Sequence, residues 1–202
     1  MENVNMNKTK DFLKQNAIYV VFVVLIIAIA LKDPRFISVS CFRDILIQSS
    51  TRIIIALGAA FVILMGGADL SAGKVVGLTA VLSASMLQLP DYSRRFFPNL
   101  PQLPLLVPII LAIAVGLLVG LLNGYIVSRF NVPAFIATLG TMVIVYGANS
   151  IYFNLPPNNS QPIGGLRGDF SKLGTGSFLG IPYIFIIAMV MTLIIYVILN
   201  KT

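Results

Sequence analysis

The chain has 202 residues, of which 57% are hydrophobic and 10% charged, with a formal net charge of +7 and a mean hydropathy of +0.93. Soluble domains carry roughly 25% charged residues, so the composition excludes a soluble domain and indicates an integral membrane protein. Cys41 is the one cysteine and histidine is absent, which argues against an internal disulfide framework, a Ser-His-Asp site and a zinc centre. The basic residues are dispersed rather than clustered, so they favour lipid headgroups over nucleic acid as neighbours.

Long unbroken apolar runs predict an all-α fold, a polytopic transmembrane helix bundle. At about 20 residues per span, the length leaves room for about six helices, whereas a membrane barrel would need alternating segments of about ten residues. We expect a polar tail at 1–16 and a transmembrane domain over 17–202. The distribution of basic residues does not determine which side of the membrane the N-terminus faces.

The first helix is predicted over Ile18–Leu31, because Pro34 disfavours helix at Asp33. A signal peptide is the alternative for this segment, but no small-x-small cleavage site follows Ala30. A short connection over Phe36–Asp44 then leads to a second helix that begins near Ile45.

The most informative stretch is Ile53–Gln88. As one helix it would be about 54 Å long, which exceeds the ~30 Å of bilayer hydrocarbon, so it must fold back on itself. The turn is predicted at Gly66–Gly73, where Asp69 or Ser71 can cap the helix that follows. Asp69 is either only a cap at the membrane surface or a group that acts in substrate passage or gating, because a carboxylate near hydrocarbon is costly.

Small residues recur at intervals of three or four in the third helix, predicted over Leu70–Leu89, and in the fourth, predicted over Leu105–Phe130. Such spacing favours close approach of a neighbouring helix. The helix-packing candidates are Gly73, Gly77, Gly116, Gly120 and Gly124. Asn123 lies beside this row of small residues. It either makes an inter-helix hydrogen bond or forms part of a polar path.

The fifth helix, predicted over Ala134–Tyr152, is unusually polar for a lipid-facing surface. Its polar residues are expected inside the bundle, as packing hydrogen bonds or as the lining of a wet cavity. They are Thr138, Thr141, Tyr146 and Asn149. The sixth helix is predicted over Ile181–Leu199.

Two proline-rich polar segments, 90–104 and 154–180, are expected outside the bilayer. The second is too polar to span a membrane and too long for a minimal turn. It is therefore either a disordered loop or a structured element that meets a partner.

Several stretches together resemble the membrane subunits of bacterial ABC importers for monosaccharides, the ribose/galactose/xylose permease group. The stretches are Gly66–Gly73 (GGADLSAG), Gly120–Gly124 and Val132–Met142. Within that group, Gln48–Gly58 and Val143–Ser150 are most similar to galactose/methyl-galactoside permeases. The resemblance covers nearly the whole chain.

The resemblance implies a multi-pass protein of the bacterial inner membrane with a cytoplasmic N-terminus and no enzymatic activity of its own. It also implies a homodimer of permease subunits, cytoplasmic ATPase subunits that use the ATP, and a periplasmic sugar-binding protein. On that reading Asp69, Asn123, Thr138, Thr141, Tyr146 and Asn149 are candidates for the substrate path. Docking candidates for the binding protein are Arg94, Arg95, Arg167 and Lys172. Family members have roughly ten helices, so the chain is expected to be an N-terminal fragment.

Other interpretations stay open at this point. One is a permease for ribose or another small polar solute. Another is an ion-coupled secondary transporter in which Asp69 binds a proton or ion at a broken helix. A structural membrane subunit would explain the small-residue ridges, whereas a membrane enzyme lacks a dense set of acids and nucleophiles.

Overall fold

The computed structural model describes residues 16–201, and the chain divides into two units, Met1–Leu46 and Ile47–Thr202. The tail predicted at 1–16 lies outside the described residues apart from Asn16. In the first unit, α2 (Ala17–Lys32) confirms the predicted first helix. The short 3-10 helix η1 (Pro34–Ile37) follows, and the Asp33 carboxylate opens it by accepting a hydrogen bond from the Arg35 amide at 2.9 Å.

Helix α3 (Val39–Leu64) begins in the first unit and continues into the second. The predicted connection over Phe36–Asp44 and the predicted start near Ile45 are therefore wrong. The physical reason is a local cap, because the Ser38 hydroxyl accepts a hydrogen bond from the Cys41 amide at 3.2 Å.

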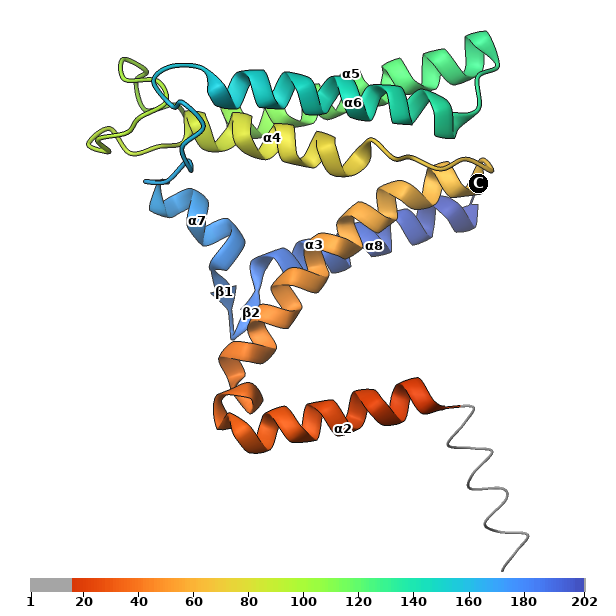
Figure 1. Ribbon diagram of the computed structural model, residues 1–202, viewed down its shortest axis with the longest axis vertical. Helices are drawn as coiled ribbons and strands as arrows, with labels where there is room; N and C mark the ends of the chain where they lie inside the picture. The colour runs from red at the N-terminus through yellow and green to blue at the C-terminus, as the bar shows by residue number, and fades with distance from the viewer. Residues whose placement is uncertain (1–15, 202) are drawn as a thin grey trace, which may run out of the picture. The chain divides into compact units, whose positions relative to one another are not determined.

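Three helices of the second unit pack against one another: α4 (Ala72–Met86), α5 (Leu106–Phe130) and α6 (Ala134–Asn154) (Figure 1). Helices α4 and α6 run in the same direction, because bonds join Leu70 to Thr138 near their starts and Ser85 to Tyr152 near their ends. Helix α5 runs the opposite way. The predicted bounds of the fourth and fifth helices agree with α5 and α6 to within two residues.

Helix α4 is shorter than the predicted Leu70–Leu89 at both ends. At its start, the Leu70 and Ser71 amides donate to the side chains of Thr138 and Asp69 instead of joining the helix. At its end, the Leu87 carbonyl accepts from the Arg167 amide at 3.0 Å, and the Leu89 amide donates to the Gly165 carbonyl at 2.7 Å. Pairing with a distant segment therefore replaces the last helical turn.

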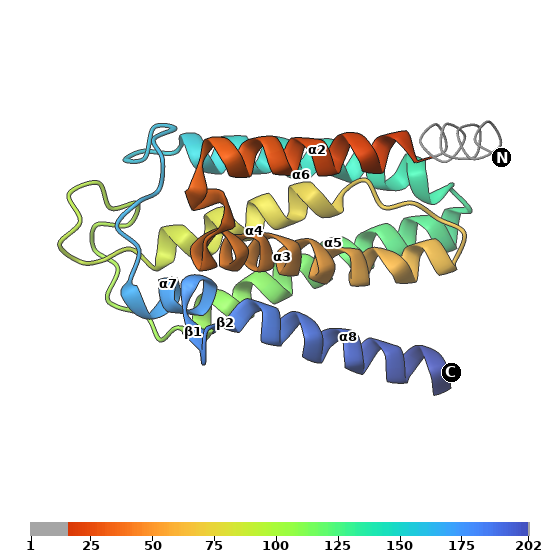
Figure 2. The same ribbon diagram turned by 90° about the horizontal axis from the view of Figure 1, so that it is seen from below.

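The segment after α6 is structured, so the disordered-loop alternative for 154–180 is wrong. It contains α7 (Gly168–Thr175) and an antiparallel hairpin of β1 (Ser177–Phe178) and β2 (Ile181–Pro182). Helix α8 (Tyr183–Lys201) follows directly (Figure 2). It starts two residues later than predicted, because Ile181 and Pro182 belong to the hairpin.

Within the described residues, four helices are long and apolar enough to cross a membrane: α3, α5, α6 and α8. Helices α2 and α4 are apolar but shorter. The all-α, polytopic bundle predicted from the sequence is confirmed.

Candidate functional site

Two glycines just after the end of α3 let the chain turn toward α4 and pass close to α6. Gly66 has φ +73, in the left-handed region, and its amide donates to the Ile63 carbonyl at 2.9 Å. A Cβ on Gly67 would lie 2.9 Å from the Cβ of Ala134. Only glycine therefore lets the turn lie this close to the start of α6.

Asp69 holds the turn in shape through one carboxylate oxygen. Its Oδ1 accepts from the Ser71 amide at 2.8 Å and from the Ser71 hydroxyl at 2.6 Å. Asp69 therefore closes the turn before α4, whereas the Ser71 side chain makes no capping bond to the helix. Both hydrogen bonds go to Oδ1. No residue in the described part of the chain donates to Oδ2.

Asn123 on α5 connects this turn to α6. Its Nδ2 donates to the Ser71 hydroxyl at 3.0 Å, and its Oδ1 accepts from the Thr141 hydroxyl. Asn123, Ser71 and Thr141 are each at least nine-tenths buried. Because buried polar groups are costly unless paired, this chain of bonds fixes α4, α5 and α6 relative to one another.

Thr138, on α6, forms hydrogen bonds with the backbone of the turn. Its hydroxyl accepts from the Leu70 amide at 3.2 Å and faces the Ala68 carbonyl at 3.2 Å. We call Asp69, Ser71, Asn123, Thr138 and Thr141 the turn network. Four of the six predicted path residues thus lie in one cluster, although residues far apart in the sequence supply them.

The other two predicted path residues lie outside the turn network. Tyr146 is 55% exposed and has the Lys74 ammonium 4.7 Å from its ring centre, a cation–π contact. The sequence predicts Tyr146 inside the bundle, but in the described chain it is exposed. Asn149 is partly buried, and its Oδ1 has no hydrogen-bond partner in the part of the chain that the structure describes.

Two cavities flank the turn network, and Asp69, Asn123 and Gly120 line both. One, of about 250 Å³, extends toward Val62 and Val127. The other, of about 370 Å³, extends along α3 and α4 and also contacts Gly116. The second lies in the range of small-molecule pockets, about 300–1,000 Å³.

The predicted packing glycines do not make close helix contacts within residues 16–201. A Cβ added to any of the five would meet no atom of a neighbouring element within 4 Å. They are Gly73, Gly77, Gly116, Gly120 and Gly124. A close approach of another helix to these glycines stays a prediction.

A second polar cluster joins the two proline-rich segments, and we call residues 87–104 and 155–167 the loop cluster. Gln88, which is 3% exposed, donates to the Gly164 carbonyl at 2.9 Å and accepts from the Phe96 amide at 2.6 Å. The Phe96 ring stacks on Tyr152 with 4.9 Å between centroids. The loop cluster is thus anchored to the end of α6.

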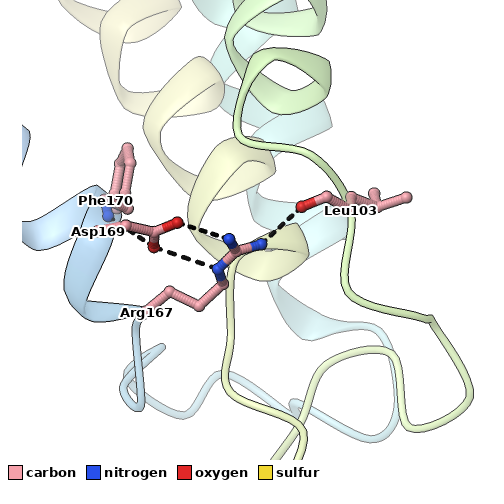
Figure 3. Close-up of polar contacts among 4 residues, drawn as sticks. All are labelled: Leu103, Arg167, Asp169 and Phe170. Atoms are coloured by element: carbon pink, nitrogen blue, oxygen red, sulfur yellow. Dashed lines mark hydrogen bonds and ion pairs between the residues drawn. The ribbon is translucent and has the colours of Figure 1, made fainter.

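Arg167 connects the loop cluster to α7 (Figure 3). Its guanidinium donates to the Leu103 carbonyl at 2.6 Å and pairs with the Asp169 carboxylate at 2.5 Å. The Arg95 guanidinium also bonds to loop backbone, donating to the Pro98 and Leu100 carbonyls. Two of the four predicted docking cations therefore hold the loops, whereas Arg94 and Lys172 are exposed.

The Arg167 contact makes the start of α7 sensitive to pH. The hydrogen bond from Arg167 holds the pKa of Asp169 below its ordinary value of 3.8. A carboxyl whose folded-state pKa is lowered stabilises the fold above its unfolded pKa, and this contribution is lost as pH falls through the lowered folded value. We expect amide protection at Phe170, whose N–H donates to Asp169, to fall in that acidic range.

Hydrogen exchange corrected for the intrinsic pH dependence measures this change. The matched variant is Asp169→Asn, which should show no step in the same range. A step of equal size in Asp169→Asn would contradict the assignment to this carboxyl.

Sequence reasoning missed two buried residues that organise these clusters. Ser71 was noted only as a possible cap, yet it joins Asp69 to Asn123. Gln88 was not singled out, because its partner Gly164 lies 76 positions away and no local pattern signals it. A glutamine at the end of an apolar run, just before Pro90, is the only local indication of a special role.

The fold and the turn network define an all-α membrane protein in which a polar turn is bonded between apolar helices. Residues 42–202 match the family described as the permease component of the branched-chain amino acid transport system, and the chain belongs to this family. It is 43% identical over its full length to the galactose/methyl galactoside import permease protein of Haemophilus influenzae, and 42% identical to that of Escherichia coli. The ribose import permease protein of Haemophilus influenzae is 34% identical over 85% of the chain and 49% of that relative.

The chain spans 61% of the length of the galactose/methyl galactoside permeases that it matches. No solved structure matches it.

Proposed function

We propose that this chain forms part of the translocation subunit of an ATP-driven importer that carries galactose or methyl galactoside across the bacterial inner membrane. The observation that carries the proposal is the identity of 41–43% over the whole chain with three permeases of that name. The ribose permeases are less similar, at 30–35%. Ribose is therefore the second candidate substrate.

The two cavities support a passage beside the turn network. Asn123 and Thr141 are buried and paired with neighbours, so they position the turn rather than offer free groups to a sugar. Asp69 lines both cavities and keeps one carboxylate oxygen without a donor in the described chain. We infer that Asp69 is the group of the turn network that contacts a passing solute, through exchangeable hydrogen bonds.

The partners proposed for the assembled importer are an ATPase subunit, a periplasmic sugar-binding protein and a second permease subunit. The loop cluster supports docking of the binding protein through Arg94, which lines a cavity of about 300 Å³ with Tyr92 and Gln161. Exposed charges of this kind steer encounter more than they hold a complex together. Arg167 and Arg95 are less suited to this role because they are already bonded to loop carbonyls.

The test is a chimera in which this chain replaces the matching part of the Escherichia coli galactose/methyl galactoside permease. Cells that keep the native ATPase and binding protein should recover uptake of radiolabelled galactose and not of ribose. A matched chimera carrying Asp69→Asn should reach the membrane in equal amount and transport more slowly. Uptake that persists without the ATPase and collapses with an ionophore would favour a secondary transporter instead.

A further inference from the structure

The hairpin before α8 presents an apolar tip. Phe178 pairs with Ile181, and Leu179 and Gly180 form the two-residue turn between them. Phe178 is 60% exposed and Leu179 is 88% exposed. Both are among the large apolar side chains that the fold leaves uncovered.

Leu179 occupies a position that its side chain disfavours. Its φ is +50, in the left-handed region, where asparagine, aspartate or glycine is the usual residue of a two-residue hairpin turn. A bulky residue in the left-handed region is an outlier, so its presence at an exposed turn is a reason to look for a function of its side chain. An apolar side chain is therefore held at the tip despite a steric cost.

The position of the hairpin in the chain places it near a membrane surface. Helix α8 has 19 residues and is apolar enough to span. At 1.5 Å per residue it is about 28 Å long, close to the ~30 Å of hydrocarbon, so its first residue, Tyr183, must lie near one interface. Leu179 precedes Tyr183 by four residues, which is at most ~14 Å of extended chain.

Backbone hydrogen bonds fix the base of the hairpin to the end of α7 and the start of α8. The Tyr183 amide donates to the Gly176 carbonyl at 3.1 Å, and the Gly176 amide donates to the Lys172 carbonyl at 2.8 Å. Gly176 lies so close to the Tyr183 ring and the α7 backbone that a Cβ has no room. In both views the hairpin tip points away from α4, α5 and α6 and across the direction of α8 (Figures 1 and 2).

We propose that the hairpin tip is a lipid-binding element, in which Phe178 and Leu179 insert at the boundary between headgroups and acyl chains. Ile181, which pairs with Phe178, is 45% exposed and extends the apolar surface, and Leu173 on α7 is 40% exposed. Lys172, exposed in the last turn of α7, supplies a cation for lipid phosphate. Apolar side chains bordered by a cation are the composition that binds in the membrane interface.

The test places a single cysteine at Leu179 in a Cys41→Ser background, labelled with an environment-sensitive fluorophore, in the 202-residue chain in lipid nanodiscs. Its emission should be blue-shifted and should be quenched by lipids with a spin label near the headgroup. A label at Leu193, exposed in the middle of α8, is the control that lipids with a spin label deep in the acyl chain should quench. A label at Asn159, exposed in the loop cluster, is the control quenched by aqueous iodide.

Iodide quenching at Leu179 equal to that at Asn159 would overturn the proposal. Shielding from both iodide and lipid would overturn it as well, because protein would then cover the tip.

A second variant separates the lipid contact from the folding of the hairpin. Leu179→Asn puts a preferred residue at positive φ, so the turn should form at least as well as in the parent chain. With the label at Phe178, this variant should lose much of the blue shift and the lipid quenching. Unchanged emission and unchanged quenching would show that Leu179 does not bind lipid.

Discussion

Asn123→Leu is expected to loosen the contact of α4 with α5 and α6 and to lower the free energy of unfolding by about 2 kcal/mol. The variant removes the amide that donates to the Ser71 hydroxyl and one of two acceptors of the Thr141 hydroxyl, which keeps the Ala137 carbonyl at 2.7 Å. Each lost hydrogen bond costs about 0.5–1.5 kcal/mol in soluble proteins, and inter-helix hydrogen bonds in membranes average ~0.6 kcal/mol. Unfolding in lipid–detergent micelles by added SDS, followed by circular dichroism, measures the change.

Leu121→Ala is the matched control, because Leu121 lies on the same helix and is 61% exposed. It should change the free energy of unfolding by less than about 0.5 kcal/mol. Ser71→Ala combined with Asn123→Leu completes a double-mutant cycle, which should give a coupling energy of about 0.5–3 kcal/mol if the two side chains interact. Equal stability of Asn123→Leu and Leu121→Ala would exclude a structural role for the turn network.

Gly165→Ala is expected to disrupt the loop cluster more than any other single methyl addition there. Gly165 has φ +66, and a Cβ would lie 2.3 Å from the Cγ of Tyr92. The left-handed backbone alone costs an alanine roughly 1–2 kcal/mol, and displacement of the ring adds to this. The rate of proteolysis within residues 87–104 and 155–167 should rise, because the Leu89–Gly165 bond would break with the cluster.

Gly174→Ala is the control for this variant, since a Cβ there meets nothing within 4 Å and alanine favours helix. Adding Tyr92→Ala to Gly165→Ala should recover part of the protection, because it removes the clash and leaves the backbone cost. If Gly165→Ala is cut no faster than Gly174→Ala, the packing of Tyr92 on Gly165 is not what holds the loops.

The helices were largely predictable because hydrophobic length and proline are local signals. The start of α3 was missed because Ser38, not the end of the polar run, caps it. The end of α4 was missed for a different reason. Leu87 and Leu89 bond to backbone beyond α6, and no local rule reports a partner nearly eighty residues away.

The candidate site was predictable as a set of residue types and not as an arrangement. Polar residues in apolar helices identified Asn123, Thr138 and Thr141, but Tyr146 has the same polarity and lies apart from them with Lys74. Which face of a helix meets a neighbour depends on how the helices pack. Ser71 acquires its role only from that packing.

By itself the sequence determined that the chain is a membrane bundle, where the apolar helices lie, and that glycines and Asp69 must form a turn between two of them. Those conclusions follow from burial of apolar length and from backbone freedom, which are properties of short stretches. Only the tertiary structure decided that Asp69, Asn123, Thr138 and Thr141 form one network, and that Arg167 holds loops rather than remaining free. Buried polar groups must find partners, and those partners come from whichever distant segments the packing of helices brings within hydrogen-bond distance.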